Sequence, residues 1–135
     1  MRKNRIQIFY KEMYDFILNN KISDTIFNTY PDSFDGLADS YVIVELPYSH
    51  RNIDISTFDV KTSFARFTFF AKDKVYKTAR MPNIVEIERM TDSILELLPF
   101  TGSNYSLMIP RTVIPPKKAN SQYHYAVINV PILFD

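Results

Sequence analysis

Side chains suited to catalysis or metal binding are few and are spread along the chain. The only histidines are His50 and His124, and neither occurs in an H-E-x-x-H or similar ligand spacing. Cysteine is absent, which removes thiolate nucleophiles and zinc sites built on sulfur. None of the serines lies in a G-x-S-x-G or S-x-x-K pattern. We therefore expect no metal, no cofactor and no enzymatic activity, with His124 a core or interface residue of a strand and His50 exposed in a loop.

The acidic side chains suggest two kinds of site, a calcium loop and a site formed by folding. Asp32, Asp35 and Asp39 are close enough in sequence to suggest a calcium loop. However, their spacing lacks the alternating ligands of such a loop, and no glutamate closes it at the twelfth position. A site assembled only by folding, from aspartate and tyrosine side chains, stays open as a hypothesis. A deep pocket that holds ionisable groups with displaced pKa values would reveal it.

Two stretches have features that occur in nucleic-acid-binding proteins. Residues 65–70, Ala-Arg-Phe-Thr-Phe-Phe, can be compared with the aromatic strand of RNA-recognition modules, but both glycines of that motif are missing. Buried phenylalanines in a covered strand are the expected outcome. Four cations, Lys72, Lys74, Lys77 and Arg80, form a basic strip that could contact phosphates. A small nucleic-acid-binding module that uses this strip is therefore the alternative function.

Two helices are predicted from apolar periodicity. Residues 83–98 have a capping residue in Asn83, a glutamate three positions later, and prolines on both sides. Their apolar side chains follow the helical period and form a wide stripe that requires a sheet to cover it. Residues 5–19 form a second amphipathic stripe, with charged residues on its other faces.

Four strands are predicted around these helices. They cover residues 41–46, 60–71, 105–114 and 123–130, with Pro110 as a bulge or edge position in the third strand. Residues 72–74 are expected to form a turn, and residues 47–59 and 115–121 are expected to form loops. The predicted fold is therefore α+β, a mainly antiparallel four-stranded sheet with two helices packed on one face, in the order αββαββ.

Length and composition predict one domain, residues 1–135, without a membrane segment. A chain of 135 residues can bury a single core, and no linker divides it. The formal net charge of +1 gives no overall field that would attract nucleic acid or an anionic membrane. No apolar signal-peptide region follows the basic N-terminal residues, so export by that route is not expected. Glycine is scarce while aromatic residues make up 15% of the chain, which favours contact surfaces over phosphate-binding loops.

In the order and length of its predicted helices and strands, the chain resembles the small tail terminator and head-to-tail joining proteins of tailed bacteriophages. The corresponding segments are 6–18, 41–46, 60–71, 83–98 and 105–130. The resemblance implies a structural subunit that forms a ring of identical copies, contacts other head or tail proteins, and resides in the virion after assembly in the host cytoplasm. It implies no reaction. Because aromatic residues are enriched in interface cores, five are proposed as contacts: Tyr48, Phe58, Tyr76, Tyr123 and Tyr125.

Overall fold

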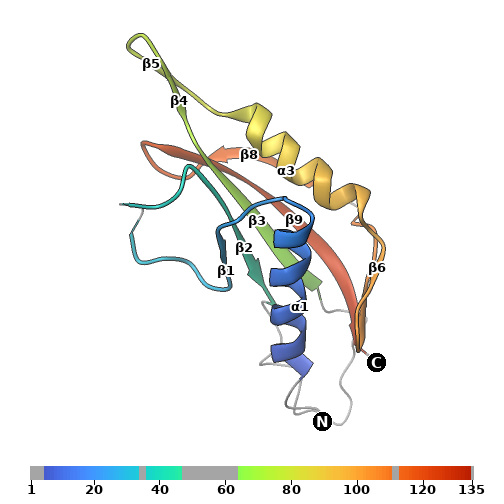
Figure 1. The fold of residues 1–135 in the computed structure, drawn as a ribbon. Coiled ribbons are helices and arrows are strands. Elements are labelled where there is room, and N and C mark those ends of the chain that lie inside the picture. Colours follow the sequence, from blue (N-terminus) through green and yellow to red (C-terminus); the bar gives the residue numbers. More distant parts are fainter. Residues whose placement is uncertain (1–4, 34–35, 47–63, 111–112, 135) are drawn as a thin grey trace.

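The computed structural model describes residues 5–33, 36–46, 64–110 and 113–134. The elements of these residues are, in chain order, α1 (Arg5–Asn19), β1 (Ile26–Phe27), β2 (Ser40–Glu45), β3 (Phe64–Lys72), β4 (Lys74–Tyr76), β5 (Ala79–Met81), α3 (Ile84–Glu96), β6 (Phe100–Thr101), β7 (Tyr105–Leu107), β8 (Val113–Lys118) and β9 (Tyr123–Phe134). Figure 1 shows a curled sheet crossed by both helices, with the β4–β5 hairpin extending beyond the rest of the chain.

The α+β class is confirmed, but the expected four-stranded, mainly antiparallel sheet in the order αββαββ is wrong. The described residues form nine strands. Seven of these strands belong to one mixed sheet, with the order β1-β2-β3-β9-β7-β6 and β8 paired to β9. Its edge strand β1 runs parallel to β2, and the other pairings are antiparallel. β4 and β5 form a separate two-stranded hairpin.

The additional strands come from segments that do not show sequence periodicity. β1 and β6 contain two residues each, too few for an alternating pattern to be recognised. The segment predicted as one strand across Pro110 is divided into β7 and β8. β8 continues through Pro115 and Pro116, which were expected to lie in a loop. This is possible because β8 is an edge strand with a register irregularity between Ile114 and Lys117, where prolines cost no ladder hydrogen bond.

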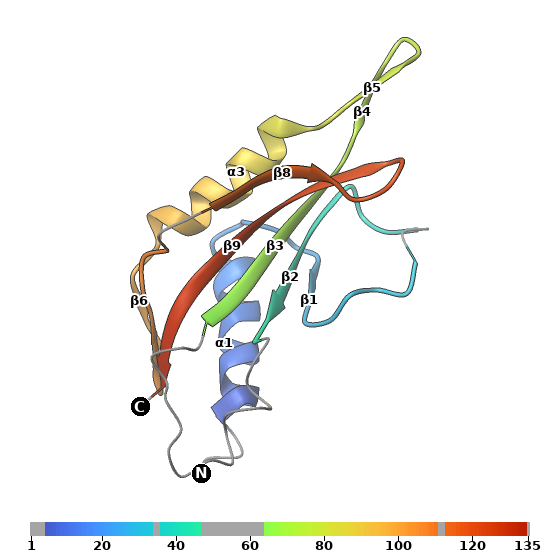
Figure 2. The same cartoon turned by 180° about the vertical axis from the view of Figure 1, so that it is seen from behind.

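The main core lies between the sheet and the two helices. The α1 side chains of Phe9, Met13 and Ile17 and the α3 side chains of Met90 and Ile94 are all fully buried. They belong to one apolar cluster with alternate residues of β2, β3 and β9. Both helices therefore cover the same face of the sheet, as predicted, and the view from behind in Figure 2 agrees with this arrangement.

A second, smaller cluster lies on the opposite face of the sheet. It consists of Tyr41, Ile43, Phe70 and Tyr123, each no more than 3% exposed. The rings of Tyr41 and Phe70 stack with centroids 4.7 Å apart. Both faces of β2 and β3 are therefore buried, which explains why the alternation in residues 60–71 is weak.

Local hydrogen bonds cap the start of α3 and the end of α1. The Asn83 side chain accepts a hydrogen bond from the Glu86 N–H, so the predicted N-cap of α3 is confirmed. α1 ends in a Schellman motif, in which Ile22 N–H donates to the Ile17 carbonyl and Lys21 N–H to the Leu18 carbonyl. Lys21 occupies the left-handed position with φ 58°, where glycine is the usual residue.

Candidate interaction surfaces

The arm, defined as residues 74–81, lies in the longest run of exposed residues among those that the structure describes. It consists of β4, a two-residue turn and β5, and all six strand residues are exposed. Val75, Tyr76 and Met81 are 62%, 68% and 54% exposed. An isolated two-stranded hairpin is marginally stable in water at best. The arm therefore presents apolar side chains to solvent without a sheet or helix packed beneath them.

Strand register divides the arm into two faces. Lys74 lies opposite Met81 and Tyr76 opposite Ala79, so these four side chains share one face. Val75 and its partner Arg80 lie on the other face. The turn begins at Lys77, whose φ of 59° lies in the left-handed region. Three of the four cations of the basic strip are thus distributed over the arm, and the fourth, Lys72, is the exposed last residue of β3.

The outer side of α3 carries the opposite charge. Val85, Glu88, Asp92 and Glu96 follow the i, i+3, i+7, i+11 spacing of one helix side and are all exposed. Val85 is 72% exposed. We call the three carboxylates at 88, 92 and 96 the acidic row. Within the described ranges, none of them takes part in an ion pair.

Arg89 connects three elements through a network beside this row. Its guanidinium donates to the Lys21 and Ile22 carbonyls, at 3.2 and 2.8 Å, and to both oxygens of Glu86. Glu86 also accepts a hydrogen bond from the Ser40 hydroxyl at 2.9 Å. The hydrogen bond from Arg89 lowers the pKa of Glu86, and together with the Ser40 hydrogen bond and the charge of Arg89 it outweighs the opposing effect of partial burial. The network joins α3 to β2 and to the end of α1, so its role is structural.

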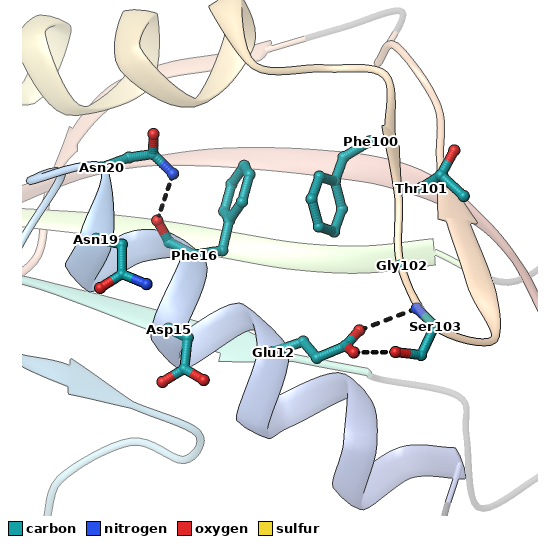
Figure 3. Close-up of a pocket in the computed structure, with 9 residues that line it drawn as sticks. All are labelled: Glu12, Asp15, Phe16, Asn19, Asn20, Phe100, Thr101, Gly102 and Ser103. Carbon is teal, nitrogen blue, oxygen red and sulfur yellow. Dashed lines mark hydrogen bonds between the residues drawn. The ribbon is translucent and has the colours of Figure 1, made fainter.

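An open hollow of about 570 Å³ lies between α1 and the β6–β7 segment. Figure 3 shows Glu12 reaching across it to the Ser103 backbone N–H and hydroxyl, both of which donate to the carboxylate. The Phe16 and Phe100 rings pack at the inner side of the hollow, with centroids 4.7 Å apart. The carboxylate of Asp15 lies near the rim (Figure 3).

The environment of Glu12 favours a structural role over proton transfer. Burial acts to raise its pKa, but the hydrogen bonds from Ser103, aided by the nearby Tyr105 hydroxyl, outweigh this effect and lower the pKa. A carboxylate held ionised in this way is a weak general base and is unprotonated near neutral pH. Burial beside Glu12 raises the pKa of Tyr105. The hydrogen bonds across this hollow therefore attach the β6–β7 turn to α1.

Of the remaining candidates from the sequence, His124 takes part in a buried contact. His124 Nδ1 lies 2.7 Å from Asp73 Oδ1, and both side chains are largely buried. Asp32 and Asp39 belong to the described part of the chain, where no cluster of three or more histidine, aspartate and glutamate side chains could hold a metal ion. His50 and Asp35 lie outside the described residues.

No helix in the described ranges is long and apolar enough to span a membrane.

The five predicted contact aromatics have different environments. Tyr76 lies on the arm and is 68% exposed. Tyr123 is 1% exposed, and its hydroxyl donates to the Ala38 carbonyl at 2.9 Å. Tyr125 is half-buried and packs against the second cluster near Tyr123. Tyr48 and Phe58 lie outside the described residues. Of the described three, only Tyr76 therefore presents its ring to solvent in the single chain.

Sequence reasoning found the cations of the arm but not the hairpin that carries them. The predicted turn at residues 72–74 is wrong, because β4 begins at Lys74 and the chain reverses after Tyr76. Lys77 and Thr78 at this reversal are not the Gly, Asn or Asp residues that mark tight hairpin turns. The acidic row was also missed, although its i, i+4 spacing could have identified it once the helix was placed.

Comparison with known proteins returned no match to a protein-family model, to a curated protein or to a solved structure.

Proposed function

We propose that this chain is a structural subunit of a tailed-phage-type particle, which forms a ring of identical copies and acts by protein–protein contact as a head–tail connector or tail terminator. The virion is its proposed location, after assembly in the host cytoplasm, and other head or tail proteins are its further partners. The observation that carries the proposal is the arm, where Val75, Tyr76 and Met81 stand exposed on a hairpin without its own core. Such a surface becomes favourable when another protein covers it.

The order of the long elements supports the proposed family. The elements of six or more residues, α1, β2, β3, α3, β8 and β9, follow one another as in the resemblance described from the sequence. The shorter strands and the arm are added between them without changing this order. The helices cover one face of the sheet, so the outer side of α3 and the arm are left for contacts between subunits.

The experiment is a mass measurement of the full chain under native conditions over a wide range of protein concentration. A ring predicts one discrete oligomer whose mass is a fixed multiple of 15.9 kDa. Electron microscopy of the same sample should show closed rings. A chain that stays monomeric at all concentrations would refute the proposal.

A second candidate function is nucleic-acid binding through Lys72, Lys74, Lys77 and Arg80, favoured by the exposure of all four side chains. If each cation neutralises one phosphate of a duplex, the slope of log K against log salt should be roughly −3.6. Oligonucleotide binding that shows this slope would support it. The absence of any binding at low salt, to single or double strands, would exclude it.

A further inference from the structure

The arm and the acidic row have complementary charge and similar length. The arm carries the cations Lys74, Lys77 and Arg80, and the row carries three carboxylates. A strand of three residues is about 10 Å long. The distance along α3 from residue 88 to residue 96 is about 12 Å. The two surfaces could therefore lie against each other along their whole length.

The acidic row is unfavourable in the single chain. Glu88 and Asp92 are four residues apart, as are Asp92 and Glu96, so like charges face each other along the helix. Glu96 also lies in the last turn, where the helix dipole disfavours a negative charge. A cationic surface placed over the row would remove this repulsion.

The arm cannot reach the acidic row of its own chain in the observed conformation. It leaves the helix at its N-terminal end and extends away from it, as Figures 1 and 2 both show. Asp92 lies about 12 Å along α3 from its first residue, in the opposite direction. The complementary surface must therefore belong to another molecule.

We infer that the arm of one copy docks on the outer side of α3 in the next copy. Lys74 and the turn residue Lys77 then face the acidic row, while Tyr76 and Met81, on the same arm face as Lys74, supply apolar contact for the exposed Val85. Each copy contributes an arm and receives one on a different surface, so the contact is heterologous. Heterologous contacts form closed rings when the rotation between copies closes. The inference rests on the proposed ring and specifies how its subunits are joined.

Two engineered cysteines test the contact in a chain that has no native cysteine. Thr78→Cys places a thiol at the tip of the arm, and Asp92→Cys places one at the centre of the acidic row. With a short bis-maleimide, the double variant should give a ladder of covalent oligomers up to the full ring. Either single variant should give nothing larger than a dimer. In the control, Lys118→Cys replaces Asp92→Cys, because Lys118 is exposed on β8 and should not meet the arm.

Charge reversal gives an independent test that requires no cross-link. Lys77→Glu and Asp92→Lys should each weaken self-association on the order of fivefold, as expected for exposed ion pairs converted to like charges. The double variant should recover most of the loss because the pair is restored with exchanged signs. Far-UV circular dichroism of each variant should match that of the parent chain, which would separate lost association from lost folding.

The outcomes separate this inference from the proposed function. A discrete oligomer that gives no ladder and does not respond to charge reversal would overturn the arm–helix contact and leave the ring proposal intact. A strictly monomeric chain would overturn both. Binding of an oligonucleotide that Lys77→Glu abolishes, without any effect on self-association, would assign the arm to nucleic acid and overturn the contact.

Discussion

The Arg89 network allows a quantitative prediction, because one side chain joins three elements. In Arg89→Ala, the ion pair with Glu86 is lost, which is worth about 0.3–0.5 kcal/mol for a partly exposed helical pair. The hydrogen bonds to the Lys21 and Ile22 carbonyls are also lost. After discounting for solvent, we assign them about 0.5 and 1 kcal/mol, the larger value to the part-buried Ile22 carbonyl. The expected loss in unfolding free energy is about 2 kcal/mol.

The assay is urea unfolding followed by circular dichroism, at a protein concentration where the association state does not change between variants. For a chain of this size, the loss corresponds to a decrease in Tm of roughly 6–8 °C. Arg89→Lys should lose about half as much, because an ammonium cannot serve both carbonyls and a carboxylate in the planar geometry of guanidinium. Arg80→Ala is the matched control. It removes an exposed arginine of the arm that has no ion pair among the described residues and should change stability by less than about 0.5 kcal/mol.

If Arg89→Ala loses no more than the Arg80→Ala control, the reasoning is refuted. The Arg89 network would then make no measurable contribution to the free energy of unfolding. A double-mutant cycle with Glu86→Gln separates the ion pair from the carbonyl contacts, since only the ion pair should show coupling between the two positions.

Three further predictions concern other positions. Lys21→Gly should raise the unfolding free energy by about 0.5–1 kcal/mol, because glycine relieves the left-handed backbone strain of the Schellman motif; an unchanged or lower urea midpoint would contradict this. The pKa values of Glu12 and Glu86 are lowered by folding, so their stabilisation is present above roughly pH 4.5 and is lost as pH falls through the folded values. Between pH 7 and pH 3, the free energy of unfolding should therefore decrease less in Glu86→Gln than in the parent chain. An equal decrease in the two chains would exclude this role for Glu86. Gly102→Ala should destabilise by about 1–3 kcal/mol, because an added Cβ would overlap the buried Tyr105 ring, and a neutral effect in thermal unfolding would disprove that overlap.

The parts of the fold that sequence predicted correctly are those with long periodic patterns. The first helix was expected at residues 5–19, and α1 has these bounds. The Asn83 cap and the apolar stripe placed α3 within two residues of its observed ends. In these segments, local propensity and burial favour the same structure, so the pattern alone is sufficient.

The division of the predicted strand 105–114 into two separate strands depends on contacts distant in the chain. β7 forms because its three residues pair with the last residues of β9, 25 to 29 positions later. β8 exists because β9 offers an open edge that tolerates prolines. For the arm, the reversal at Lys77 uses a left-handed lysine, so the usual turn signal is missing. The Arg89 network could not be predicted, because its acceptors are backbone carbonyls almost 70 residues away.

For the proposed ring, the sheet edges favour contact between copies through side chains over strand addition. Strand addition needs a long edge with free N–H and carbonyl groups. On the described residues, β1 is a two-residue edge, and β8 presents consecutive prolines followed by exposed Lys117 and Lys118. Proline lacks the N–H that an added strand requires, and exposed lysines oppose edge pairing. The arm and α3 instead offer apolar and charged side chains that require no backbone pairing. A head-to-tail contact through them would therefore join copies without exposing the main sheet to uncontrolled strand addition.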